Sequence, residues 1–138
     1  MLTRTALLSM VGFVGFFATA NAQTVAAVPP GSAFDGTYRL VTSTKVNETY
    51  TGRGGKMGHC PERRPGPLHV LDGKAHYTTA SGHRIAAMVG PQGELDMRMS
   101  LPGTNTLEMQ IAGKIDNTGT VQVRQRGNSC SYDFVWKK

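Results

Sequence analysis

Near its carboxyl end the chain reads Cys130-Ser-Tyr-Asp-Phe-Val-Trp136, a stretch that holds the only tryptophan of the 138 residues. The cysteine and the three aromatic residues occupy alternate positions, so in an extended strand all four side chains point to one face. Ser131 and Asp133 take the other face, as is typical of a strand with one side in water. Because aromatic side chains dominate the energetics of cores, this stretch predicts the strand around which the core is built.

Alternation of apolar and polar residues recurs upstream, whereas no stretch of twelve residues carries apolar side chains at helical spacing. The alternating runs are separated by turns that end in glycine: Asp72-Gly73, 80–82, 91–93 and 117–119. The first turn suits a two-residue hairpin with positive φ at both residues, and the others suit three-residue loops with a left-handed glycine. Eight strands are therefore predicted, at residues 36–45, 68–71, 74–79, 84–89, 94–101, 106–115, 120–126 and 130–136.

Counting outward from these turns places apolar residues opposite one another, and a slip of one residue would turn each set outward. The predicted pairs are Val70 with Ala75, Tyr77 with Ile85, Ala87 with Met97, Val89 with Leu95, and Ile115 with Val121. The predicted fold is all-β: a single small antiparallel meander that closes into a β-barrel, because closure leaves no exposed edge. Closure pairs the first strand, with Tyr38 and Leu40 inward, against the last strand. A two-sheet β-sandwich is the alternative.

The first residues predict export. Arg4 precedes an apolar run at 6–18, and Ala20-Asn21-Ala22 supplies the small residues of a cleavage site before Gln23. Residues 1–22 are therefore predicted to be a signal peptide, residues 23–33 a disordered lead-in and residues 34–138 the β-barrel domain. An uncleaved membrane anchor is the alternative, but the run is shorter than the roughly 20 residues that span a bilayer. The expected location is the periplasm or the exterior, with no transmembrane segment after cleavage.

The charge is moderately basic. Loss of Arg4 with the leader lowers the formal net charge from +6 to +5. Such a surplus favours an anionic or protein partner in the cell envelope, or simply keeps a secreted protein soluble. Export argues against nucleic acid as a partner, and nothing in the sequence assigns an oligomeric state.

The two cysteines, Cys60 and Cys130, are expected to pair, because an exported chain folds in an oxidising compartment. The bond would close a loop of about 70 residues and contribute roughly 4 kcal/mol in the chain-entropy model. The alternative is a reactive thiol at Cys60, since the cations around it would lower its pKa.

The start Phe34-Asp-Gly-Thr-Tyr38, the two cysteines and the end Cys130–Trp136 together resemble small secreted bacterial β-proteins of unassigned function. More distantly, Gly36-Thr37-Tyr38 is similar to the Gly-x-Trp of lipocalin-like and avidin-like barrels. In its size and its single expected disulfide, the chain also resembles secreted β-barrel inhibitors of proteases and lysozyme. The resemblance implies a small barrel closed by one disulfide and implies no activity.

The longest stretch without alternation, residues 47–67, is rich in glycine and in positive charge. Long loops in compact domains often bind partners, so it is predicted to be a partner-binding loop. The alternatives are a solvated connection or a plug for the barrel end. Its candidate contact residues are Arg53, Lys56, His59, Arg63 and Arg64.

Three histidines, His69, His76 and His83, recur at intervals of seven. The predicted register places the first two opposite each other on the outer face and the third on the inner face, with no carboxylate as a third ligand. No metal site and no cofactor are expected. The inward positions also lack a nucleophile–base pair or paired carboxylates, so no enzyme activity is predicted.

These observations predict a non-catalytic exported binding protein, most simply a protein-binding or inhibitory module that uses the basic loop 47–67. The alternative is a carrier of small apolar ligands with a pocket at the barrel mouth, near Tyr38, Tyr77, His83 and Trp136. A structural protein of the envelope is the third possibility.

Overall fold

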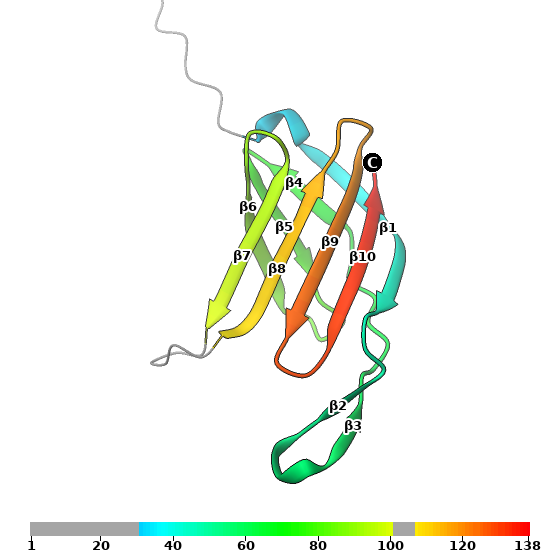
Figure 1. Cartoon of the computed structure of the whole chain (residues 1–138). Coiled ribbons are helices and arrows are strands. Elements are labelled where there is room, and N and C mark those ends of the chain that lie inside the picture. The colour runs from blue at the N-terminus through cyan, green and yellow to red at the C-terminus, as the bar shows by residue number, and fades with distance from the viewer. Residues whose placement is uncertain (1–30, 101–106) are drawn as a thin grey trace, which may run out of the picture.

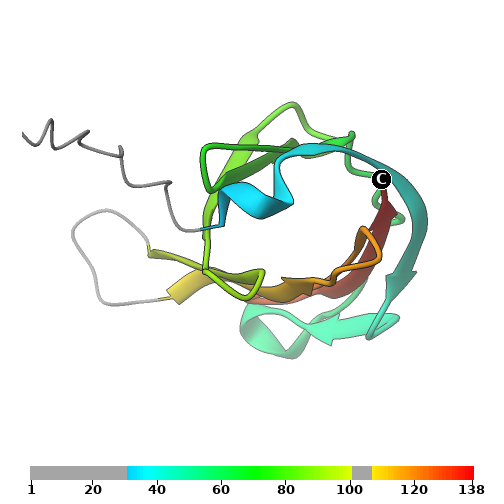
Figure 2. The ribbon, with the colours of Figure 1, turned by 90° about the horizontal axis from the view of Figure 1, so that it is seen from above.

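The computed structural model describes residues 31–100 and 107–138. The predicted signal peptide, residues 23–30 of the lead-in and residues 101–106 lie outside the described part. Eight antiparallel strands form a closed barrel in the order β1-β10-β9-β8-β7-β6-β5-β4 (Figures 1 and 2), which confirms the predicted barrel and excludes the sandwich. The barrel strands are β1 (Gly36–Lys45), β4 (Leu68–Leu71), β5 (Lys74–Thr78), β6 (Arg84–Val89), β7 (Glu94–Ser100), β8 (Leu107–Ile115), β9 (Thr120–Gly127) and β10 (Ser131–Lys137).

The structure adds four short elements that the sequence pattern did not indicate. Two short strands, β2 (Thr49–Thr51) and β3 (Met57–His59), pair with each other around the 3-10 turn η2 (Arg53–Gly55). A further 3-10 turn, η1 (Ser32–Phe34), lies over the end of the barrel that is uppermost in Figure 1 and faces the viewer in Figure 2; this end is called the upper end below. The chain is therefore already ordered within the predicted lead-in. Within residues 31–100 and 107–138, no helix is long and apolar enough to cross a membrane.

The predicted turns set the register. Asp72 and Gly73 have φ angles of 51° and 71°, as a two-residue hairpin of this kind requires. The ladders pair Val70 with Ala75, Tyr77 with Ile85, Val89 with Leu95, and Ile115 with Val121, as predicted. Between β6 and β7 the ladder covers Val89–Leu95 and Met88–Asp96, in the same register as the predicted pair of Ala87 and Met97.

The aromatic row of β10 lies at the centre of the core. Tyr132, Phe134 and Trp136 are buried, and Trp136 is fully inaccessible. The Tyr77 ring packs between Phe134 and Trp136, with centroids 6.4 and 5.4 Å away. At the upper end the Tyr38 hydroxyl donates to the Phe34 carbonyl at 2.5 Å, which ties η1 to the barrel. The upper part of the barrel is therefore filled by side chains.

A β-bulge in β1 changes which residues face inward. Leu40 pairs with Trp136 but Thr42 pairs with Val135, so Val41 is an extra residue on the β1 side. After the bulge, Ser43 lies opposite Phe134 and Lys45 opposite Tyr132, on the inward face. The bulge thus brings two polar side chains to the lower end of the barrel, where segment 60–67 packs.

Candidate functional site

The predicted partner-binding loop 47–67 consists of two parts with different roles. Residues 49–59 form the β2–β3 hairpin, which projects beyond the lower end of the barrel (Figure 1). Residues 60–67 return along the barrel end and pack against it. The sequence did not predict the hairpin, because strands of three residues are too short to show alternation.

The hairpin has its own side-chain packing. Tyr50 lies directly opposite Gly58. A Cβ atom at Gly58 would lie 2.5 Å from the Tyr50 ring, so the absence of a side chain lets the ring cover the backbone. At the tip, Gly54 and Gly55 have φ angles of 76° and 73°, which allow the chain to reverse within the η2 turn. These contacts define the shape of the projecting hairpin.

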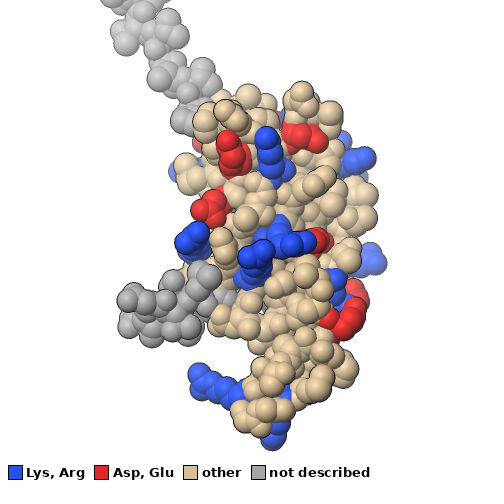
Figure 3. Space-filling model, in the orientation of Figure 1, with Lys and Arg blue, Asp and Glu red and all other residues tan. Residues whose placement is uncertain are grey.

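The hairpin tip is cationic and exposed. Arg53 and Lys56 are both exposed, and the Met57 side chain between them and the barrel is 72% accessible. Residues 49–59 contain no Asp or Glu. Figure 3 accordingly shows blue but no red atoms on the visible face of the hairpin. Neither tip cation takes part in an ion pair within the described ranges.

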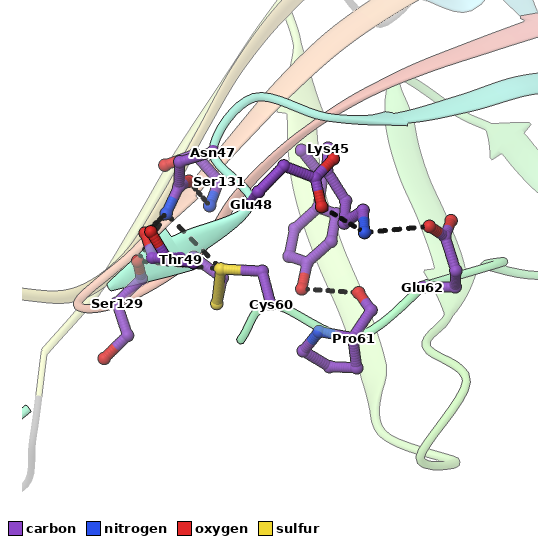
Figure 4. The surroundings of a disulfide bond; sticks show 11 residues. Lys45, Asn47, Glu48, Thr49, Cys60, Pro61, Glu62, Ser129 and Ser131 are labelled. Atoms are coloured by element: carbon purple, nitrogen blue, oxygen red, sulfur yellow. Dashed lines mark hydrogen bonds and ion pairs between the residues drawn. A yellow bond between two sulfur atoms is a disulfide. The ribbon is translucent and has the colours of Figure 1, made fainter. Parts of the chain in front are cut away.

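The nearest acidic residues along the chain, Glu48 and Glu62, form ion pairs at the base of the hairpin. Lys45 Nζ lies 2.6 Å from Glu48 and 3.0 Å from Glu62 (Figure 4). Its hydrogen bonds to these two carboxylates raise the Lys45 pKa above its ordinary value. Lys45 offsets part of the charge of these two carboxylates, and Arg53 and Lys56 at the tip take no part in this cluster.

The base is also covalently fixed to the barrel. Cys60 and Cys130 form the predicted disulfide, with Cα atoms 5.6 Å apart, and Cys60 is buried. Asn47 adds a polar cluster beside it (Figure 4): its Nδ2 donates to the Thr49 and Ser129 carbonyls at 3.0 and 2.9 Å, and its Oδ1 accepts from Ser131 N–H at 2.8 Å. One amide therefore joins the hairpin, the β9–β10 turn and β10.

Replacing Asn47 by Ala should lower the free energy of unfolding by about 1–2 kcal/mol, because two backbone carbonyls and one N–H lose their partner. Urea denaturation of the variant and the wild type measures this difference. Asn128→Ala is the matched control: Asn128 is exposed, lies in the neighbouring turn, and makes no side-chain hydrogen bond within the described part. Equal stabilities of Asn47→Ala and the control would contradict this role.

Segment 60–67 seals the lower part of the barrel between β1 and β5. The Tyr132 hydroxyl donates to the Pro61 carbonyl at 3.0 Å, and the Ser43 hydroxyl donates to the Arg63 carbonyl. Trp136 Nε1–H donates to the Gly66 carbonyl at 3.0 Å, and Gly66 N–H donates to the Thr78 carbonyl. Segment 60–67 is thus held to three barrel strands by hydrogen bonds.

The five predicted contact residues therefore do not share one surface. Arg53, Lys56 and His59 belong to the hairpin and are exposed. Arg63 belongs to the packed segment, with its guanidinium carbon 5.2 Å from the centre of the Tyr132 ring, whereas its neighbour Arg64 is exposed.

The lower end of the barrel also opens into a cavity of about 420 Å³. Of the predicted pocket residues, His83 lies at its exposed rim, and Tyr77 lies beneath it, with its hydroxyl donating to Gln125 Oε1 at 2.7 Å. Tyr38 lies at the opposite end of the barrel and Trp136 within the packed core, so the four residues do not line one pocket.

On the outer face, His69 and His76 lie opposite each other with ring centroids 5.2 Å apart, as the register predicted. Burial and the nearby Arg84 lower the His76 pKa. Within the described ranges, no group of three or more His, Cys, Asp or Glu side chains is arranged to hold a metal ion.

Comparison with known proteins gave no match: no family model fits the chain, and no curated protein or solved structure is similar to it.

Proposed function

We propose that this chain is an exported, non-catalytic binding protein that uses the β2–β3 hairpin to bind, and so to inhibit or recruit, an envelope protein with an anionic surface. The observation that carries the proposal is the hairpin itself. It projects from the barrel, is fixed at its base by the Cys60–Cys130 disulfide, and presents Arg53 and Lys56 without acidic neighbours in residues 49–59.

Preorganisation is the first physical reason. A loop that is already ordered loses little conformational entropy on binding, so more of the contact energy appears as affinity. The disulfide, the Asn47 cluster and the Lys45 ion pairs restrain the ends of the hairpin, and the Tyr50–Gly58 packing restrains its middle. The barrel serves as the rigid support.

Chemical complementarity is the second reason. Cations at the tip attract an acidic surface and accelerate the encounter at low salt. The exposed Met57 side chain supplies an adaptable apolar contact beside them. A short basic hairpin with one apolar side chain fits an acidic cleft on a folded protein better than it fits a small molecule, because it offers a convex surface and no enclosed volume.

Neutralising the tip tests the proposal. The double variant Arg53→Gln/Lys56→Gln should bind the partner about tenfold or more weakly, and the remaining binding should depend less on salt. The partner is first isolated by affinity capture from an envelope extract on immobilised protein, and its Kd is then measured by surface plasmon resonance. The matched control, Arg98→Gln/Lys114→Gln, removes the same charge from exposed positions of the barrel wall.

The two double variants separate a hairpin site from a general charge effect. Retained affinity in the control with loss in the hairpin variant supports the proposal. Equal losses in both variants would mean that net charge alone attracts the partner. An unchanged Kd in the hairpin variant would reject the hairpin as the contact.

A further inference from the structure

We propose that the lower mouth of the barrel is a binding site for a small amphipathic carboxylate, that is, a molecule with one carboxylate and an apolar chain or ring. This inference goes beyond the proposed function, since the mouth and the hairpin tip are separate surfaces. Three features of the mouth carry it: an apolar stretch of its wall, the side chain of the buried residue Gln125 at its base and a cation held beside Gln125.

Part of the cavity wall is apolar and adaptable, beside a rim of polar residues. Ile85 and Met109 are nearly buried, Met99 is 41% exposed, and all three line the cavity together with Tyr132. The volume of about 420 Å³ lies within the range of small-molecule sites. Higher in the barrel, the space among Leu68, Ala75 and their neighbours is only about 10 Å³. A ligand therefore fits at the mouth and not in the centre of the barrel.

The base of the cavity carries an oriented hydrogen-bond donor. Gln125 is the only buried polar residue of the described part, with 5% of its surface accessible. Its Oε1 accepts the hydrogen bond from the Tyr77 hydroxyl, and burial raises the Tyr77 pKa, so this hydroxyl stays protonated. The Gln125 NH₂ group has no acceptor among the residues that the structure describes. Because Gln125 lines the cavity, this group is available to donate to an oxygen of a ligand there.

The cation beside this donor is Arg63. Arg63 and Gln125 both line the cavity, and both also border a smaller void of about 10 Å³ next to Tyr77, so the two residues are neighbours. The Tyr132 ring and the hydrogen bond from Ser43 to the Arg63 carbonyl hold the arginine in place. No Asp or Glu of the described part lines the cavity. A guanidinium matches a carboxylate in charge and geometry.

The arrangement fixes the orientation of the ligand. The carboxylate lies between Arg63 and the Gln125 amide, and the apolar part extends along Met109 and Met99 toward solvent. A cationic head group would meet the arginine with no acidic residue to compensate it, and a purely apolar ligand would leave the Gln125 donor without an acceptor. Charge therefore discriminates between ligands of equal apolar size.

The test uses decanoate and decyltrimethylammonium, two probes with similar chains and opposite charges, at concentrations below micelle formation. Isothermal titration calorimetry should show saturable binding of decanoate and none of decyltrimethylammonium. In NMR spectra, decanoate should shift the Gln125 side-chain amide and the methyl groups of Met99 and Met109. Binding of both probes alike, of neither, or shifts confined to other residues would overturn the proposal.

Variants assign the contact. Arg63→Met keeps the apolar stem and removes the charge, and it should weaken decanoate binding about tenfold or more. Arg64→Met is the matched control, because Arg64 is the exposed neighbour and does not line the cavity; its affinity should equal that of the wild type. Equal affinity of Arg63→Met and Arg64→Met would overturn the role of Arg63. If Arg63→Met does not fold, the comparison of the two probes on the wild type still decides the proposal.

The outcome is independent of the hairpin. The variant Arg53→Gln/Lys56→Gln should bind decanoate as the wild type does. Failure of the mouth site would leave the hairpin proposal intact, and failure of the hairpin proposal would leave the mouth site intact.

Discussion

Replacing both Cys60 and Cys130 by alanine should lower the melting temperature by about 15–20 °C, which corresponds to roughly 4 kcal/mol for a domain of this size. The bond joins residues 70 apart and encloses six of the eight barrel strands, β4 to β9. Without the disulfide this loop is no longer closed, so the unfolded chain gains conformational entropy and becomes more favourable. Because small domains are stable by only about 5–15 kcal/mol, the loss is a large fraction of the total.

Differential scanning calorimetry with and without reductant measures the effect and supplies its own control. The reduced wild type should melt near the temperature of the double alanine variant, and the variant itself should not respond to reductant. A wild type whose melting temperature stays the same after complete reduction, verified by thiol titration, would contradict the predicted contribution. The base of the hairpin should also lose amide protection, since Cys60 N–H donates to the Glu48 carbonyl beside the bond.

Replacing Trp136 by Ala should cost about 3–5 kcal/mol, because it removes the largest fully buried side chain of the described core. Replacing it by Phe keeps an aromatic ring but removes the donor to the Gly66 carbonyl, and this should cost about 1–3 kcal/mol. Urea denaturation followed by far-ultraviolet circular dichroism measures both values without relying on tryptophan emission. Hydrogen exchange of the Gly66 amide then shows whether segment 60–67 loosens.

Tyr38→Phe is the matched control for the phenylalanine variant. It also removes one hydrogen bond to a carbonyl, but the acceptor is Phe34 and not a residue of segment 60–67. Gly66 should exchange faster in Trp136→Phe and at the wild-type rate in Tyr38→Phe. Wild-type exchange at Gly66 in both variants would show that the indole does not hold the segment.

The barrel was predictable because three kinds of local signal agreed. The alternation in β10, the glycine-ended turns and the apolar pairs such as Tyr77 with Ile85 each indicated the same register, and the ladders confirm it. The disulfide followed from cysteine number and expected export. These signals depend only on neighbouring residues or on composition, and a sequence displays both.

The candidate sites were less predictable because they depend on where the chain departs from regular alternation. After the bulge at Val41, odd-numbered instead of even-numbered residues of β1 face inward. Residues 42–45 are all polar, so no apolar alternation indicates this change. The β2–β3 hairpin is too short for alternation, although Tyr50 and Gly58 placed symmetrically about a Gly-rich centre were a signal for it. The site at the barrel mouth could not be predicted, because it is formed by residues that lie far apart in the sequence. Arg63 packs against Tyr132 of β10, and Gln125 of β9 accepts a hydrogen bond from Tyr77 of β5.

Two junctions of the barrel have short ladders. The strands β1 and β4 share three residue pairs, from Gly36–Val70 to Tyr38–Leu68, and β6 and β7 share two, whereas β9 and β10 share seven. Below Leu68, segment 60–67 lies between β1 and β5. The side chains of Ser43, Tyr132 and Trp136 hold this segment by hydrogen bonds to its carbonyl groups. Local unfolding is easiest where few backbone ladder bonds must break at once. Local opening is therefore expected first at these two junctions, and at β1–β4 it would loosen segment 60–67, and with it Arg63, before the β9–β10 ladder separates.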